Sequence, residues 1–355
     1  MNIQKEYEKE LELFMKEKLE KIINIPSPSG YTKELIRYLK TESEALGFQT
    51  ELTRRGALIV TLSDKTKNKR LLAAHCDTLG AMVRTVMEDG TLKLLQIGGY
   101  MLESVEGEYC TIHTRKGKKY TGTILTSAPS VHAYPDSARE LKRTDDAMRI
   151  RLDEDVHSKE DVLKKTEIRR GDFISFEPRF QAFENGYIKS RHLDNKASVA
   201  VFMAVMKAVA EAVIKPKIGS QVMFTNYEEV GFGASYIPDN IYEMIAVDMG
   251  SVGDDLEGDE KKVSIVTKDM QGPYDFDLVT KLIDLAEKEE LDYVVECYRR
   301  YKSDTAAAIA GGRNIRHGLV GQGVQASHHM ERTHIHGMIQ NFKLLASYIE
   351  SDNDF

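Results

Sequence analysis

Cysteine, tryptophan and long apolar runs are scarce in this 355-residue sequence. It contains no tryptophan and three widely spaced cysteines, Cys76, Cys110 and Cys297. This small, odd number excludes a disulfide scaffold and favours a reducing compartment. No segment approaches the roughly 18 apolar residues of a membrane span, and the first residues lack the apolar core of a signal peptide. We therefore expect a cytoplasmic protein that does not associate with membranes.

An excess of basic residues is also missing, because 49 Lys and Arg stand against 56 Asp and Glu, for a formal charge of −7. Nucleic-acid binding requires a concentrated basic face, so we expect no nucleic-acid partner. Hydrophobic residues make up 41% and charged residues 30%, which is typical of a soluble globular protein. The length allows one large domain or two smaller ones.

Helical and strand-like segments alternate at both ends of the chain. Residues 5–24 and 32–46 have helical apolar periodicity, and residues 49–62 read as two short strands that turn at Arg55-Gly56. After residue 186 the alternation resumes, with a strongly apolar helix over 195–213 and a closing helix over 334–349. This alternation is typical of an α/β layer fold.

The segment from Thr78 to Ala182 differs, because short β-like runs alternate with turns that contain glycine. A polar stretch, residues 135–165, lies within it and includes a predicted short helix over 159–165. It is either a solvated insertion or a contact surface. We predict one catalytic domain formed by residues 1–77 and 183–355, interrupted by an inserted β-rich domain over 78–182.

Candidate catalytic residues follow the predicted strands, where open α/β sheets place their sites. They are His75, Asp77, Asp194, Glu228, Glu229, Asp248 and His328. His75 is a possible metal ligand, and Asp77 can orient it because alternate side chains of a strand share a face. Ordinary surface hydrogen bonds would explain the same pair.

Each of the other residues also has a structural alternative. Asp194 stands where a helix N-cap belongs, although a carboxylate can bridge two cations. The pair Glu228-Glu229 would point in opposite directions if the backbone is extended, so that one side chain binds metal and the other acts as general base. A solvated loop is the alternative. Asp248 ends a buried strand, where a cation or backbone N–H groups would stabilise it.

Together these residues supply enough ligands for two metal ions that share one carboxylate. Nitrogen and oxygen donors suit zinc, cobalt or manganese. His329 and His334 compete with His328 for the ligand role. Cys76 should point away from His75 and Asp77, and we interpret it as a core residue.

The sequence resembles the tetrahedral (TET), or glutamyl, aminopeptidase family of dinuclear metallopeptidases. The motifs that carry the resemblance run in family order: Pro26-Ser27-Pro28-Ser29-Gly30, Ala74-His75-Cys76-Asp77-Thr78-Leu79-Gly80, Gly171-Asp172, Arg191-His192-Leu193-Asp194-Asn195-Lys196, Asn226-Tyr227-Glu228-Glu229-Val230-Gly231, Val247-Asp248, Ser303-Asp304 and Ser327-His328. The resemblance implies a mixed-sheet α/β/α metallopeptidase domain with an inserted, barrel-like dimerisation domain.

Residue roles follow from this resemblance. His75, Asp194 and Asp248 would bind one divalent ion, and Asp194, Glu229 and His328 would bind the other. Zinc is the expected metal, with cobalt or manganese as alternatives. Glu228 would be the general base that activates a bridging water, and Asp77 would orient His75. Ser303 and Asp304 would lie near the substrate, although Ser-Asp-Thr replaces the common Thr-Asp-Ala.

The implied function is removal of N-terminal residues from short peptides that have a free amine. Family resemblance also implies a homo-oligomer, with dimers assembled into a dodecamer. Another amide hydrolase on the same scaffold, a deacylase or a carboxypeptidase, is an alternative. A non-catalytic scaffold protein is a more distant one. The sequence does not define the preferred N-terminal residue.

Overall fold

The computed structural model describes residues 5–352 and divides them into two compact units, residues 5–77 with 179–352, and Thr78–Pro178. The second unit ends four residues earlier than the sequence analysis places the end of the insertion. The reason is strand β10 (Gln181–Ala182), which pairs with β11 (Tyr187–Ser190) and so belongs to the first unit. Each unit has its own hydrophobic core.

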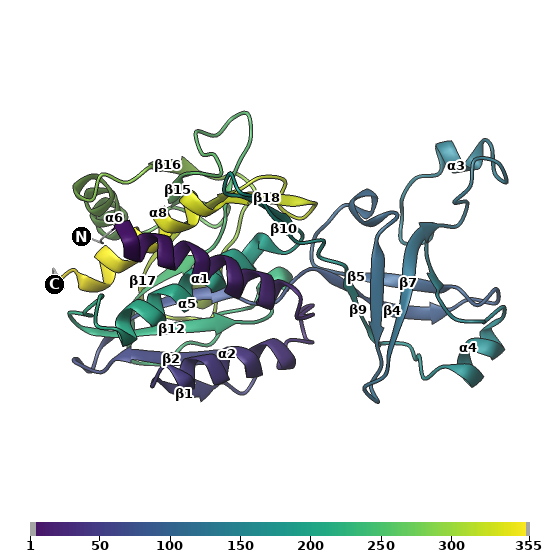
Figure 1. The fold of residues 1–355 in the computed structure, drawn as a ribbon, viewed down its shortest axis with the longest axis horizontal. Coiled ribbons are helices and arrows are strands. Elements are labelled where there is room, and N and C mark those ends of the chain that lie inside the picture. The colour runs from purple at the N-terminus through teal and green to yellow at the C-terminus, as the bar shows by residue number, and fades with distance from the viewer. Residues whose placement is uncertain (1–4, 353–355) are drawn as a thin grey trace. The chain divides into compact units, whose positions relative to one another are not determined.

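A nine-stranded mixed sheet organises the first unit (Figure 1), with strand order β1-β2-β12-β3-β13-β17-β15-β16 and with β14 paired to β17. Its strands are β1 (Gln49–Leu52), β2 (Leu58–Ser63), β3 (Lys69–His75), β12 (Gly219–Thr225), β13 (Ile241–Val247), β14 (Gly250–Ser251), β15 (Val263–Lys268), β16 (Tyr293–Cys297) and β17 (Arg316–Val324). The central strands β12, β3, β13 and β17 run parallel. They are buried and rich in apolar residues, as parallel strands covered on both faces are.

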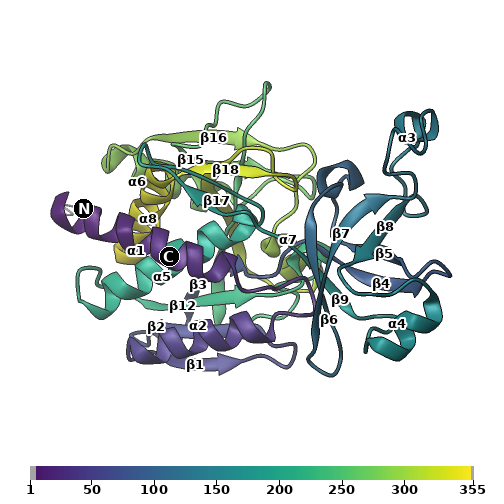
Figure 2. The same cartoon turned by 45° about the vertical axis from the view of Figure 1, so that its right-hand side comes forward.

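Helices cover this sheet, and α2 lies beside β1 and β2 in both views (Figure 1, Figure 2). The helices of the first unit are α1 (Lys5–Ile23), α2 (Lys33–Ala45), α5 (Leu193–Ala210), α6 (Phe276–Lys288), α7 (Asp304–Ala310) and α8 (Ile335–Glu350). A short three-stranded sheet combines β10, β11 and β18 (Glu331–His334). None of the described helices is both long and apolar enough to cross a bilayer.

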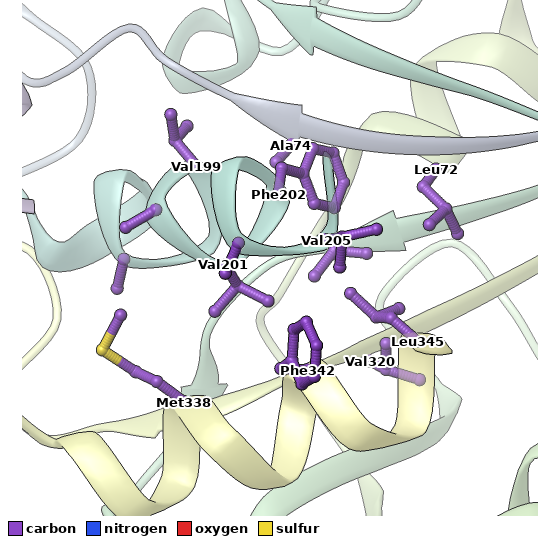
Figure 3. Close-up of a cluster of buried hydrophobic side chains, with 14 of the residues drawn as sticks. Leu72, Ala74, Val199, Val201, Phe202, Val205, Val320, Met338, Phe342 and Leu345 are labelled. Carbon is purple, nitrogen blue, oxygen red and sulfur yellow. The ribbon is translucent and has the colours of Figure 1, made fainter. Parts of the chain in front are cut away.

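Helix α5 is the centre of the main core and is almost entirely buried, because other elements cover all of its faces. Val201 and Val205 of α5 face Phe342 and Met338 of α8, while Phe202 lies on the side of β3 (Figure 3). This arrangement explains why the α5 sequence is apolar all round rather than amphipathic. By contrast, α1 is amphipathic and buries one stripe that includes Leu11, Met15 and Leu19.

The second unit is a closed six-stranded barrel with strand order β4-β5-β8-β7-β6-β9. The strands are β4 (Gly80–Val86), β5 (Leu92–Ile97), β6 (Tyr109–His113), β7 (Lys119–Thr126), β8 (Met148–Leu152) and β9 (Phe173–Phe176). Three short helices accompany them: η1 (Leu102–Val105), α3 (Ser137–Glu140) and α4 (Lys159–Lys165). Closure leaves no sheet edge unpaired, and the predicted α/β fold with a barrel-like insertion is confirmed.

Candidate metal centre

Three neighbouring parallel strands end at one edge of the large sheet. Strand β3 ends at His75, β13 is followed directly by Asp248, and β12 is followed by a 3-10 helix, η2 (Glu228–Val230). Because the carboxyl ends of parallel strands meet at the same edge, these side chains lie close together. The parallel pairing of β3 with β13 therefore brings His75 close to Asp248, although the two residues are 173 positions apart in the sequence.

Two further residues reach this edge from outside the sheet. Asp194 lies at the start of α5 and His328 follows β17. Asp194 lies at a kink near the start of α5, with φ and ψ angles of −77° and 101°. Within residues 5–352 its carboxylate accepts no hydrogen bond from an N–H group of α5, so the side chain does not cap the helix, and it faces two histidines instead. Its Oδ1 lies 3.1 Å from His75 Nε2, and its Oδ2 lies 3.3 Å from His328 Nε2.

The predicted ligands form two overlapping sets. His75, Asp194 and Asp248 make one set, and Asp194, Glu229 and His328 make the other, with donor atoms within 4.8 Å of one another in each. Asp248 Oδ1 lies 3.8 Å from His75 Nε2, and Glu229 Oε2 lies 3.4 Å from His328 Nε2. Asp194 belongs to both sets, with a different oxygen facing each histidine.

The other candidate ligands lie elsewhere. His329 Nδ1 accepts a hydrogen bond from the Met330 N–H, and His334 contacts the backbone of Asn185 and His336. Cys76 is fully buried in the main core and joins neither ligand set. Of the three neighbouring histidines, the structure thus brings only His328 to the cluster.

Burial and repulsion between neighbouring carboxylates raise the pKa values of several acidic residues in the cluster. Burial raises the pKa of Glu228 and of Glu229 well above the usual range, and neighbouring carboxylates act in the same direction. Burial together with the charge of Asp194 raises the pKa of Asp248 to about 7. An isolated carboxylate cluster of this kind is unfavourable, and bound cations would relieve the repulsion.

Asp194 and His75 behave differently because they contact each other. Although burial disfavours its charge, hydrogen bonds from His328 and His75 hold the pKa of Asp194 below its usual range. Burial lowers the pKa of His75, but the hydrogen bond to Asp194 and the charge of Asp248 outweigh it and raise that pKa. His75 and Asp194 thus stabilise each other's charge, whereas burial dominates at Glu228, Glu229 and Asp248 and raises their pKa values.

The residues fit a pair of divalent cations. Within residues 5–352, Glu229 Oε1 is buried and has no hydrogen-bond partner. Such an atom is costly unless something else contacts it. His75 Nδ1 lies 3.0 Å from the backbone oxygen of Asp77, which can only accept, so Nδ1 donates there and Nε2 is the nitrogen that faces the cluster. A bound cation would replace the Nε2 proton that donates to Asp194 in its absence. Imidazole nitrogen with carboxylate oxygen is the donor set of zinc, cobalt and manganese sites.

Comparison with known proteins agrees with this geometry. The sequence profile of the M42 glutamyl aminopeptidase family matches residues 56–344. The chain belongs to this family. It is therefore a peptide hydrolase of the aminopeptidase type, and the resemblance read from the sequence motifs is confirmed. The family also uses divalent metals, in agreement with the clustered ligands.

One relative and two solved structures illustrate the similarity. This M42 chain is 44% identical to "Putative aminopeptidase YhfE" of Bacillus subtilis (strain 168) over 337 residues, 94% of this chain and 97% of that protein. A TET aminopeptidase from a marine-sediment Thaumarchaeota archaeon has the same fold, with a TM-score of 0.85, 18% identity and 95% and 96% of the two chains covered. The TET1 peptidase of Pyrococcus horikoshii superposes with a TM-score of 0.82 at 24% identity, covering 94% and 98%.

Asp77 has a different set of contacts from the one expected in this M42 peptidase. Its carboxylate oxygen lies 3.7 Å from His75 Nδ1, and that nitrogen donates its hydrogen bond to the backbone oxygen of Asp77 instead. The carboxylate accepts hydrogen bonds from the N–H groups of Glu228 and Glu229, at 3.2 and 3.3 Å, and from the Ser29 hydroxyl. Asp77 thus ties the Pro-Ser-Pro-Ser-Gly segment and the glutamate pair to the end of β3.

The backbone of the glutamate pair is helical rather than extended. Tyr227 has a φ of 75° and turns the chain into η2 directly after β12. The expectation that extended backbone separates the two side chains is therefore wrong. The side chains still diverge, because Glu229 Oε2 contacts His328 while Glu228 Oε2 lies 3.8 Å from His75 Nε2.

Glu331 is a site residue that the sequence analysis missed. It is 1% exposed, and its two oxygens accept hydrogen bonds from the N–H groups of Asp194 and His328, each at 3.0 Å. Burial and the charge of Asp194 raise its pKa to about 8. The sequence shows that Glu331 lies three residues after His328. Its contact with Asp194, 137 positions away, could be recognised only in the folded structure.

Ser303 and Asp304 are buried at the start of α7. The Ser303 hydroxyl lies 3.1 Å from the Tyr274 hydroxyl. Asp304 accepts hydrogen bonds from the Ala234 N–H, at 2.8 Å, and from the Thr225 hydroxyl. A Cβ atom on Gly233 would lie 2.1 Å from Asp304 Oδ1, so this close approach requires glycine. Asp304 therefore fixes the loop that follows η2.

Proposed function

We propose that this chain is a dinuclear metal-dependent aminopeptidase that removes N-terminal residues from short peptides with a free amine. The observation that carries the proposal is the pair of ligand sets that share Asp194, with Glu228 beside them. Family membership supports the aminopeptidase activity, and the shared carboxylate supports two metal ions rather than one.

Under this proposal His75, Asp194 and Asp248 hold one divalent ion, and Asp194, Glu229 and His328 hold the other. Zinc is the metal we propose, with cobalt or manganese as alternatives, because all the donors are nitrogen or oxygen. When bound, such ions lower the pKa of a water molecule and polarise a carbonyl oxygen. Asp77 and Glu331 orient the ligands through the hydrogen bonds that they accept.

We assign the general-base role to Glu228. Its side chain is 14% exposed, and Oε2 lies near His75, while no hydrogen bond from residues 5–352 occupies that oxygen, so the carboxylate can reach a water molecule at the cluster. In this role Glu228 takes a proton from water as the water oxygen bonds to the scissile carbonyl carbon, and it gives that proton to the amine nitrogen as the C–N bond breaks. We place Ser303 and Asp304 near the substrate, where Asp304 holds the loop that follows η2 through the Ala234 N–H and Ser303 contacts the Tyr274 hydroxyl.

Paired substrates test the activity. The protein, supplied with zinc, cobalt or manganese, is incubated with an alanyl, leucyl, lysyl and glutamyl tripeptide series and with the same peptides after N-acetylation. We expect release of the first residue from the free-amine peptides only, together with about two bound ions per chain by elemental analysis. Cleavage of only the acetylated peptides would instead support a deacylase, and release of the last residue from both series would support a carboxypeptidase.

We also propose that the barrel is a dimerisation domain and that dimers assemble into a dodecamer. The TET1 peptidase of P. horikoshii is described as assembling into a tetrahedron or a large octahedral shell. On the barrel of this chain, Met101 and Tyr109 are 66% and 68% exposed, and such large exposed apolar groups favour association. The three free cysteines support a reducing location such as the cytoplasm.

Light scattering tests the assembly. The native chain should have a molar mass of about twelve protomers, and replacing Met101 and Tyr109 with glutamate should reduce it to that of a smaller species. A native chain that is monomeric at micromolar concentration would contradict the assembly without affecting the assignment of the metal ligands.

A further inference from the structure

A basic groove lies on the first unit, between α2 and the turn that joins β1 to β2. The cavity has a volume of about 540 Å³ and is lined by Lys33, Arg37, Lys40, Arg54 and Arg55. Its described lining includes no aspartate or glutamate. A concentration of positive charge on a chain whose formal charge is −7 is unexpected for a solvated face.

Helical spacing builds one wall of this basic groove. Lys33, Arg37 and Lys40 are separated by four and three residues, so they share one face of α2. Ile36, which is 5% exposed, lies within the same wall. Lys40 forms an ion pair with Glu44, whereas no ion pair of Lys33 or Arg37 is present among the described residues. Within the described part of the chain, Lys33 and Arg37 thus present unpaired positive charge beside the apolar side chain of Ile36.

The turn of the hairpin builds the opposite wall. The Arg55 guanidinium lies over the rings of Tyr227 and Phe232, at 5.8 and 5.5 Å from their centroids, and donates to the Phe232 carbonyl at 2.8 Å. These contacts fix its position. A second cavity of about 390 Å³ lies against the same turn and shares Arg54 and Arg55 with the first.

The basic groove and the metal centre are built on the same loop. The Asn226 side-chain amide donates to the hydroxyl of Thr32, at 3.2 Å, and to the backbone oxygen of Arg55, at 2.9 Å, so it joins both walls of the groove. Glu228 follows two residues later. Because β2 pairs with β12 through Leu58 and Phe224, the arginine turn lies at the sheet edge that also carries the metal ligands.

We propose that this basic groove binds acidic side chains of the peptide substrate that lie downstream of the first residue. The inference rests on the proposed aminopeptidase function and names the substrate class that this site favours. Arginine and lysine side chains attract carboxylates through charge-assisted hydrogen bonds. Asn226 and Tyr227 line the groove and directly precede the proposed base Glu228, and this continuity is the reason for assigning the downstream part of the substrate to the groove.

Matched peptides and matched variants test the groove. The best N-terminal residue from the tripeptide series, X, is placed in X-Gly-Glu-Glu and X-Gly-Gln-Gln, and the ratio of their kcat/KM values is measured. The test variant combines Lys33→Gln, Arg37→Gln and Arg54→Gln. The control variant combines Lys9→Gln, Lys21→Gln and Lys288→Gln, which removes equal charge from exposed positions outside the groove.

We expect the wild-type protein to prefer the acidic peptide, and the preference should fall as salt is raised. An exposed ion pair contributes a factor of about 1.4 to 5, so the test variant should lower the ratio roughly tenfold, mainly through KM. The control variant should keep the wild-type ratio.

Equal ratios in all three proteins would overturn the inference. The same conclusion would follow if the test variant kept the acidic preference but lost binding to fluorescein-labelled heparin, since the groove would then bind another polyanion. Failure of the wild-type protein to cleave either peptide would instead contradict the proposed function.

Discussion

Strands β3 and β13 carry buried charged residues at both of their ends. The two groups differ in whether neighbouring protein groups balance the charge. At their amino ends, Arg70 and Glu243 pair at 3.1 Å, and each is 2% exposed. At their carboxyl ends, His75 and Asp248 belong to the metal-ligand cluster. The first cluster is neutralised by the protein itself, while the second has an excess of carboxylates.

The contacts of Arg70 show how the first cluster is satisfied. Its guanidinium donates to Glu243 and to the backbone oxygens of Tyr348, Ser351 and Asp352, and it lies 4.6 Å from the centroid of the Tyr348 ring. The Arg70 cluster thus ties the end of α8 to the sheet. A buried charge whose hydrogen-bond and ion-pair partners are all present serves the fold. A buried cluster with an excess of negative charge is instead a place where a cation can bind.

The largest expected effect is on turnover. Glu228→Gln removes the proposed proton acceptor but keeps the shape of the side chain, so kcat should fall by about 10²–10⁴-fold. Two metal ions should remain bound by elemental analysis. Glu20→Gln, at an exposed position of α1, is the control and should keep full activity. Substantial activity in Glu228→Gln would remove this residue from the mechanism.

Breaking the Arg70 cluster should have the largest effect on stability. Arg70→Met leaves the buried Glu243 carboxylate without its main partner, which should lower the free energy of unfolding by about 3–5 kcal/mol in urea titrations. Combining it with Glu243→Met removes both charges and should restore most of the loss. If the double variant is no more stable than the single one, packing rather than charge holds this end of the sheet.

Asp194→Asn tests the shared carboxylate. For the wild-type protein, zinc at one hundred times its Kd should raise the free energy of unfolding by about 2.7 kcal/mol. Because each Asp194 oxygen faces a different histidine, the variant should lose most of this stabilisation and bind fewer ions. Asp284→Asn, on the exposed face of α6, is the control. Unchanged binding of two ions by Asp194→Asn would exclude the bridging arrangement.

Glu331→Gln should weaken metal binding without unfolding the protein. Glutamine can accept from only one of the two N–H groups that position Asp194 and His328, so metal affinity should fall by about 10–100-fold in competition with a chromophoric chelator. Glu296→Gln is a matched control, since Glu296 is also buried and accepts from the N–H groups of Glu257 and Gly258. Equal affinities in both variants would contradict the positioning role of Glu331.

The smallest expected effect is on the free energy of unfolding and concerns Asp275, which lies beside the Arg70 cluster. Asp275 caps α6 by accepting from the Leu278 N–H at 2.8 Å, and it pairs with Arg316, which also contacts Glu243. Asp275→Ala should lower the free energy of unfolding by about 1 kcal/mol.

The pH dependence of this contribution has a defined sign. Partial burial opposes the charge of Asp275, but the hydrogen bond from Arg316 outweighs it and lowers the pKa. Since the folded state then binds a proton less readily than the unfolded state, the contribution is present above about pH 4 and disappears as pH falls through the lowered pKa. The stability gap between the wild type and Asp275→Ala should therefore close in acid, whereas a gap that widens in acid would contradict this sign.

Sequence patterns predicted most of the elements because the patterns are local. The stripe of α1, the hairpin that turns at Arg55-Gly56, and α4 at residues 159–165 all lie where periodicity and turn residues place them. Errors arose where backbone geometry depends on distant contacts. The N-cap alternative for Asp194 is an example, because its carboxylate contacts His75 and His328 and its N–H donates to Glu331.

By itself, the sequence determined the α/β class, the family and the identity of the candidate ligands, because residue types and their order encode these. Only the tertiary structure decided that His328 rather than His329 joins the cluster, and that Glu331 holds two ligand backbones. Only the structure assembled the basic groove from α2 and the distant Asn226 loop. The physical reason is that donor distances, burial and unpaired charge depend on contacts between residues more than a hundred positions apart.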